Sequence, residues 1–246
     1  MKTWRLDLLN WQEIRGLIPE KIKGVILPTG TIEAHGATAL GTDSILAEKI
    51  AEKMAPKVNC LIAPTINYGI TNTLLQYPGS ITVSRESFMS YVLDIFKGLA
   101  RLGFDRILVM NGHGGQEKEL NELVTEYNKS TGIKMLQIEW WYFCNEPRIK
   151  VYDCETDGGH AGLEETAMML GLCPEGVRKD LFDPKIVASF EYKFRAVPAP
   201  GTILSPPGAP DPVFDEKLGD RFTEEIIEIL TKTTLDVFKQ WDTLFG

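Results

Sequence analysis

Residues 106–110 have the sequence RILVM, and the sequence NGHGG follows directly at residues 111–115. A short, almost continuous run of apolar residues is typical of a strand that is buried on both faces of a sheet. Three further runs share this character, GVILP at 24–28, CLIAP at 60–64 and KMLQIE at 134–139. The sequence therefore predicts four strands buried in one sheet.

Helical patterns alternate with these runs. Apolar residues recur at i, i+3, i+4 and i+7 in segments 44–55, 86–101 and 116–130, as in amphipathic helices that cover a sheet. A further pattern of this kind occupies residues 216–239. Alternation of strands and helices indicates an α/β fold with a mostly parallel sheet. The length fits one domain, which we expect to span residues 1–246.

The composition is that of an ordinary globular protein, with 26 Lys and Arg against 34 Asp and Glu, a net charge of −8. This acidic balance disfavours a nucleic-acid partner, because phosphate binding usually needs a basic face. The chain shows no signal-peptide pattern and no apolar run that would span a membrane, so we expect a cytoplasmic protein without a membrane partner. Four cysteines lack C-x-x-C pairing and are expected to be reduced: Cys60, Cys144, Cys154 and Cys173.

A proline-rich stretch stands out near the C-terminus. Residues 196–212, AVPAPGTILSPPGAPDP, contain six of the fourteen prolines, and this density predicts an extended, irregular segment. Only one helical pattern, at 216–239, follows it, and one helix cannot form a domain. We interpret the stretch as a long loop on the same domain, placed at a subunit contact.

The three histidines, His35, His113 and His160, all lie beside glycine. A single histidine is usually a structural residue, but three in glycine turns form a different pattern, because glycine allows close backbone approach. His35 and His113 follow two of the predicted strands. Ligands bind at the carboxyl ends of strands in open α/β sheets, so we expect these two imidazoles to face one site.

Carboxylates accompany the histidines. Glu33 lies two residues before His35, so both side chains can point the same way in an extended turn. Asp43 follows in GTD, and Glu164 and Glu165 follow His160. Histidine together with carboxylate suits Zn²⁺, Mn²⁺ or Fe²⁺, and a carboxylate can bridge two such ions.

Simpler explanations exist for the same residues. Asp43 precedes a predicted helix and suits its N-cap, while Glu164 and Glu165 suit the first turn of a helix, where the dipole favours negative charge. The NGHGG loop at 111–115 resembles an anion-binding turn, although it lacks the lysine of a P-loop. A metal- or anion-binding module without catalysis is therefore the alternative to an enzyme.

Three ordered motifs resemble those of the creatininase (creatinine amidohydrolase) family. GTIEAHG at 30–36, with GTD at 41–43, is similar to G-x-x-E-x-H-G followed by T-D. NGHGGQ at 111–116 is similar to N-G-H-G-G-N, and DGGHAGLEETA at 157–167 is similar to D-x-G-H-A-G-x-x-E-T-S. Order and spacing hold over roughly residues 20–225.

The resemblance implies a three-layer α/β/α fold and two divalent metal ions per chain, Zn²⁺ first and Mn²⁺ or Fe²⁺ as alternatives. Creatininase itself takes a Glu ligand two residues after the second-motif histidine, where this chain has Gly115. The fifth ligand then falls in the third motif, at Glu165, with Glu164 as the alternative. His160 is implied to transfer protons. The implied metal ligands are Glu33, His35, Asp43 as the bridge, His113 and Glu165.

The resemblance also implies a hydrolase in which metal-bound hydroxide attacks the carbonyl of a small molecule. The expected bond is C–N, in a cyclic amide or a formamide, and the alternative is opening of an oxidised cyclitol or sugar-like ring at a C–C or C–O bond. Trp140 and Trp141 are candidate substrate-binding residues, with a strand end or subunit contact as the alternative. Family members are commonly homo-oligomers, often hexamers, so we expect a homo-oligomer.

Overall fold

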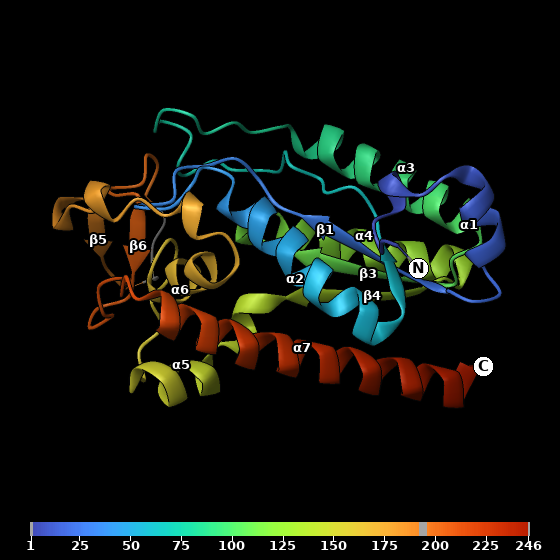
Figure 1. Cartoon of the computed structure of the whole chain (residues 1–246). Coiled ribbons are helices and arrows are strands. Elements are labelled where there is room, and N and C mark those ends of the chain that lie inside the picture. Colours follow the sequence, from blue (N-terminus) through green and yellow to red (C-terminus); the bar gives the residue numbers. More distant parts are fainter. Residues whose placement is uncertain (1, 192–195, 246) are drawn as a thin grey trace.

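A computed structural model describes residues 2–191 and 196–245, and a parallel four-stranded sheet lies at its centre (Figure 1). The strands have the order β2-β1-β3-β4, with bounds Gly24–Thr29 for β1, Cys60–Ile62 for β2, Arg106–Asn111 for β3 and Lys134–Glu139 for β4. All neighbouring strands are parallel. Thr29 pairs with Asn111, which pairs with Glu139, so β1, β3 and β4 end together at one edge.

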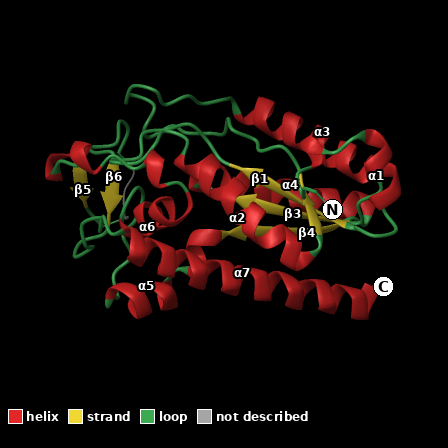
Figure 2. Cartoon of the chain, viewed as in Figure 1, coloured by secondary structure: helices red, strands yellow, loops and turns green. Residues whose placement is uncertain are grey.

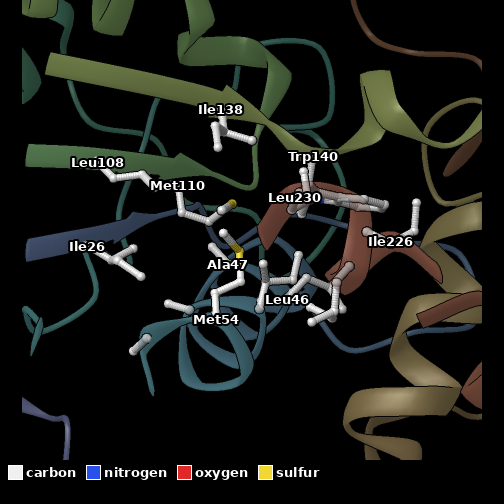
Figure 3. Close-up of a cluster of buried hydrophobic side chains, with 14 of the residues drawn as sticks. Ile26, Leu46, Ala47, Met54, Leu108, Met110, Ile138, Trp140, Ile226 and Leu230 are labelled. Atoms are coloured by element: carbon white, nitrogen blue, oxygen red, sulfur yellow. The ribbon is translucent and has the colours of Figure 1, made fainter. Parts of the chain in front are cut away.

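Both faces of this sheet are buried, which explains the continuous apolar runs in the sequence. Successive strand residues point to opposite faces. Val25 and Leu27 lie in one hydrophobic cluster, and Ile26 between them lies in the other. Figure 3 shows Ile26 in the second cluster together with Met110 from β3 and Met54 from the covering helix.

Helices cover both faces and make three layers (Figure 2). The Ile26 face packs against α2 (Thr42–Val58), α6 (Leu163–Leu172) and α7 (Glu216–Phe245). The Val25 face packs against α3 (Arg85–Leu102) and α4 (Glu117–Thr131), with Ile14 and Leu17 of α1 (Trp11–Leu17) at its margin. The α/β/α expectation is therefore confirmed, as are the four helices predicted from apolar periodicity.

Local signals set the ends of these helices. The Ser84 side chain accepts a hydrogen bond from the Ser87 N–H at the start of α3, and Gly103 ends that helix at φ 104°. Gly41 directly precedes α2, which ends at Asn59 in the left-handed region at φ 52°. Residues 30–41 connect the carboxyl end of β1 to the start of α2.

The chain between β4 and α7 contains elements that apolar periodicity does not predict. These are α5 (Asn145–Tyr152), α6 and a small parallel sheet of β5 (Val187–Ser189) and β6 (Ile203–Ser205). The prediction of irregular structure throughout residues 196–212 is wrong at β6, where apolar Ile203 is buried. The Leu204 N–H donates to the carbonyl oxygen of His160 at 3.0 Å, so the proline-rich stretch is tied to the third motif.

No described helix combines the length and the apolar character needed to cross a membrane. All four cysteines are described, and each is free of a disulfide. Cys60 and Cys144 are buried, whereas Cys154 and Cys173 are partly exposed.

Candidate functional site

The first two motifs meet at the carboxyl ends of β1 and β3, as the sequence predicts. The loop after β1 carries Glu33 and His35, α2 begins with Asp43 in its first turn, and His113 follows β3 by two residues. His35 Nε2 lies 2.9 Å from Asp43 Oδ1, and His113 Nδ1 lies 2.8 Å from Asp43 Oδ2. One carboxylate therefore contacts both imidazoles, one with each oxygen.

Asp43 belongs to two separate groups of metal-ligating side chains. Glu33, Asp43 and His113 form one group, and His35, Asp43 and Glu165 form the other; within each, the ligand atoms lie within 4.8 Å of one another. The N-cap interpretation of Asp43 is wrong, because Gly41 holds that position and Asp43 lies inside α2. The first turn of the helix aims this carboxylate between the two histidines.

Backbone carbonyl groups fix the orientation of all three histidine rings. His35 Nδ1 lies 3.3 Å from the carbonyl oxygen of Glu33, His113 Nε2 lies 2.9 Å from that of Ile70, and His160 Nε2 lies 3.0 Å from that of Ala34. A carbonyl oxygen only accepts, so the ring nitrogen beside it carries the proton. The other nitrogen faces the carboxylates, and it would present its lone pair to a metal ion once the ring is neutral, which is the arrangement that second-shell partners impose on metal-binding histidines.

The electrostatics of this centre call for a cation. Glu33, His35, Asp43 and His113 are all buried. Burial alone would lower the pKa of His113, but the Glu33 and Asp43 carboxylates outweigh it and raise that pKa to about 9. Burial would likewise raise the pKa of Asp43, but His35 and then His113 hold it well below its usual value. Among the described residues, His35 Nε2 and Asp43 Oδ2 have no partner with hydrogen-bond geometry despite their short contacts. Each of these atoms belongs to a residue of the candidate ligand groups, so both fit coordination of a metal ion.

The two adjacent glutamates of the third motif lie in the first turn of α6 and point in different directions. Glu165 Oε2 lies 3.5 Å from His35 Nε2 and accepts from the Ala161 N–H. Glu164 instead pairs with Arg148 at 2.8 Å. Burial and then Asp157 raise the pKa of Glu164, whereas His35 lowers that of Glu165 against the effect of burial. The geometry places Glu165, and not Glu164, with the ligand groups.

His160 lies beside the centre and is only half-buried. Its Nδ1 is 3.6 Å from Glu33 Oε1, and its ring centroid is 4.3 Å from that of His35. It forms a group with Glu33 and His35 but is absent from both groups around Asp43. The ring is thus within reach of a molecule bound at the centre.

Gly115 lies where the family resemblance implies a glutamate, and the local packing explains a glycine here. A Cβ at this position would overlap His113 Nε2 and the carbonyl oxygen of Ile70. Any side chain would therefore break the hydrogen bond that orients the His113 ring. Glu165 lies with the candidate ligand groups without disturbing that bond.

Four residues of this centre, Asp43, His113, His160 and Glu165, line a cavity of about 770 Å³. Its described lining includes both tryptophans of the sequence prediction, but they differ: Trp140 is fully buried in the hydrophobic core (Figure 3), while Trp141 is partly exposed. Sequence reasoning missed Tyr142, whose hydroxyl lies 3.0 Å from Glu117 Oε2. The lining consists of Asp43, Gly112, His113, Gly114, Glu117, Trp140, Trp141, Tyr142, Asp157, Gly159, His160, Glu164, Glu165 and Pro206.

The fold and the site together define an α/β/α protein with a carboxylate–imidazole centre at the carboxyl edge of a parallel sheet. The family model for creatininase, described as creatinine amidohydrolase, matches residues 7–233. The chain belongs to the creatininase family.

Relatives within this family have different substrates in their names. Creatinine amidohydrolase of Pseudomonas putida is 27% identical over 224 residues, 80% of this chain and 85% of that protein. The 3-dehydro-scyllo-inosose hydrolase of Thermotoga maritima is 30% identical over 163 residues, 63% of this chain and 52% of that protein. The mycofactocin precursor peptide peptidase of Mycobacterium ulcerans is 27% identical over 175 residues, 66% of this chain and 64% of that protein. All three relatives are hydrolases by name.

Solved structures share the fold over almost the whole chain. A creatininase mutant of Zn–Zn type superposes with a TM-score of 0.81, at 23% identity over 97% of this chain and 99% of that one. A manganese form of creatininase superposes with a TM-score of 0.78, at 23% identity over 96% and 99%.

Proposed function

We propose that this protein is a hydrolase that uses two divalent metal ions to cleave a C–N bond next to a carbonyl group in a small molecule. The observation that carries the proposal is the position of Asp43, which is shared by two groups of three ligand atoms. One carboxylate oxygen contacts each histidine, so a single side chain can serve two ions. A non-catalytic anion-binding loop would not need this buried set of carboxylates.

The five proposed ligands form two sets of three that share Asp43. Glu33 and His113 complete one set with it, and His35 and Glu165 complete the other. Imidazole and carboxylate donors suit Zn²⁺, Mn²⁺ and Fe²⁺, and zinc and manganese appear in the names of the creatininase structures that share the fold. A pair of such ions polarises a carbonyl oxygen and lowers the pKa of water.

His160 is the proposed proton-transfer residue. Its Nε2–H donates to the Ala34 carbonyl oxygen, so Nδ1, which lies 3.6 Å from Glu33 Oε1, is the nitrogen that would receive a proton and pass it to a leaving nitrogen. The ring borders the cavity and is half-buried, so it can touch a bound substrate. Trp141 forms part of the cavity wall and is the proposed apolar contact for the substrate.

A second candidate reaction is the opening of an oxidised cyclitol ring at a C–C or C–O bond. The 30% identity to a 3-dehydro-scyllo-inosose hydrolase favours it. Two relatives whose names denote amide or peptide hydrolysis favour the C–N bond, and we rank it first. For either reaction, we propose that the chain acts as one catalytic domain within a homo-oligomer.

The metal content of the protein tests the proposal directly. Elemental analysis after saturation with Zn²⁺, Mn²⁺ or Fe²⁺ and desalting should give two ions per chain, and Asp43→Asn should lose both. Asp94→Asn, at an exposed aspartate of α3, is the matched control and should keep two. A wild-type content of one ion or fewer would contradict the two-metal site.

A substrate panel then separates the two reactions. Lactams, formamides, creatinine and oxidised inositols are offered with each metal in turn, and the released products are measured. Turnover of a lactam, a formamide or creatinine supports the C–N assignment. Turnover confined to the oxidised inositols would replace it with ring opening.

A further inference from the structure

A buried ion pair lies directly behind the third motif. Arg148 of α5 and Glu164 of α6 are each 4% exposed, and Arg148 Nη1 lies 2.8 Å from Glu164 Oε1. Neither residue belongs to the ligand groups around Asp43, and Arg148 is not part of the described cavity lining. Neither side chain takes part in the proposed metal binding or proton transfer.

The guanidinium of Arg148 connects α5 to the chain that leads into the third motif. Besides Glu164, it donates to the Asn145 side chain at 2.9 Å, to the Glu155 carbonyl oxygen at 2.8 Å and to the Cys154 carbonyl oxygen at 3.2 Å. Only the planar fork of an arginine can donate in so many fixed directions at once. The segment that precedes the motif is therefore held in one conformation by a single side chain.

Glu164 extends this connection to the turn that carries His160. Its second oxygen accepts from the Gly158 N–H at 2.9 Å, while the neighbouring Glu165 accepts from the Ala161 N–H. A Cβ on Gly158 would overlap Glu164 Oε2, so the turn lies directly against this carboxylate. The two glutamates thus hold the turn at both of its ends.

The pair also determines which glutamate faces the centre. Consecutive residues of a helix point about 100° apart, so a side chain fixed at Glu164 directs Glu165 to a different side. With Glu164 turned to Arg148, Glu165 Oε2 lies 3.5 Å from His35 Nε2. Apolar residues often replace a buried ion pair without loss of stability, so stability alone does not account for this one.

We propose that Arg148 is a positioning residue for the metal centre, which acts through Glu164 and the backbone of residues 154–158 to hold Glu165 and His160 in place. The inference rests on the proposed function, because it requires Glu165 to be a metal ligand. Arg148 itself contacts neither the ligand groups nor the cavity.

Zinc titrations of Arg148→Lys test this role. The lysine keeps a positive charge opposite Glu164, so the fold is retained, but one ammonium group cannot replace the guanidinium fork. We expect one of the two zinc ions to bind about 10–100-fold more weakly, the usual cost of losing an outer-shell partner, while the other ion is unaffected. Arg178→Lys is the matched control, because Arg178 forms an exposed pair with Asp180, and it should change neither affinity.

The Glu165→Gln background distinguishes positioning from a general structural effect. This variant should retain one zinc ion, and adding Arg148→Lys to it should leave the affinity for that ion unchanged. If Arg148→Lys weakens the remaining ion as well, the residue supports the whole fold and the inference is wrong. The inference is also wrong if the wild-type protein binds two ions and the Arg148→Lys variant binds both of them equally well. That result would leave the proposed function unaffected.

A double variant guards against misfolding of the single one. Arg148→Met with Glu164→Leu removes both charges, so no unpaired charge remains buried. This double variant should also weaken one zinc ion by about 10–100-fold. Unchanged binding of both ions in the double variant would overturn the inference in the same way.

Discussion

The candidate site joins two regions that are built differently. Glu33, Asp43 and His113 come from the carboxyl edge of the sheet, where β1 and β3 pair in register and hydrophobic clusters fill both faces. His160 and Glu165 come from a turn and a short helix outside the sheet. Apolar packing holds the strands of the first region and backbone carbonyl groups orient its histidine rings, whereas the second region depends mainly on polar contacts with its surroundings.

Those polar contacts come from three directions. The Leu204 N–H of β6 donates to the His160 carbonyl oxygen, the Ala34 carbonyl oxygen holds the His160 ring, and Arg148 supports the glutamates from behind. β1 and β3 pair in register within the core, but the turn outside the sheet is held by these individual contacts. Changes in the sheet region should therefore remove metal, whereas changes in the third-motif region can separate metal binding from turnover.

The largest difference is expected between His113→Ala and His160→Ala. His113→Ala removes a ligand from the sheet region and should lose metal and activity together. His160→Ala should keep near-normal metal content and lose about 10²–10⁴-fold in kcat, the usual contribution of a general acid or base. Elemental analysis and steady-state kinetics on the same preparations measure both effects.

The proposed difference between the two histidines is contradicted if His160→Ala is isolated without metal, because His160 would then be a ligand. The proposed difference is also contradicted if that variant retains full turnover, since His160 would then have no part in catalysis. Only a loss of turnover with metal retained separates the two regions.

A smaller difference is expected within the third motif, between Glu165→Gln and Glu164→Gln. Glu165→Gln should weaken one metal ion by at least about 100-fold, more than outer-shell changes usually do. Glu164→Gln should affect that ion less, because its carboxylate faces Arg148 and not the centre. Its main effect should be a lower free energy of unfolding, by about 3–5 kcal/mol, because Arg148 is left as a buried unpaired charge.

Chelator competition and urea denaturation of both variants check this prediction. The reverse pattern, in which Glu164→Gln loses the metal ion and Glu165→Gln is destabilised, would place the ligand one residue earlier in the motif.

The sequence predicted the sheet region well and the third-motif region poorly, and the reasons are physical. The four strands and the helices around them carry strong apolar patterns, because each is buried against a continuous core. The ten residues of α6 are buried on nearly all sides and show no apolar stripe. The three-residue strands β5 and β6 are too short to produce a pattern.

The same division applies to the site. The glycine-flanked histidines and most of their carboxylates are visible as motifs and come together in the structure, whereas Glu164 turns to Arg148. Arg148 belongs to no motif, and only the fold places it against Glu164. Tyr142 lies in a conspicuous aromatic run, but its contact with Glu117 joins residues from two different elements. Partners supplied by tertiary structure leave no local signal.

The smallest expected effect concerns Trp141, which lies in the cavity wall between the two regions. Trp141→Ala should raise KM about tenfold with little change in kcat or metal content. A tenfold change corresponds to about 1.4 kcal/mol, the value of roughly 55 Å² of apolar contact at about 25 cal/mol per Å². Trp11→Ala, at the exposed tryptophan of α1, is the control and should leave KM unchanged. The competing interpretation of Trp141 as a subunit contact predicts a different result, a change in the mass measured by light scattering with KM unaltered. That outcome would remove Trp141 from the substrate site and assign it to the interface.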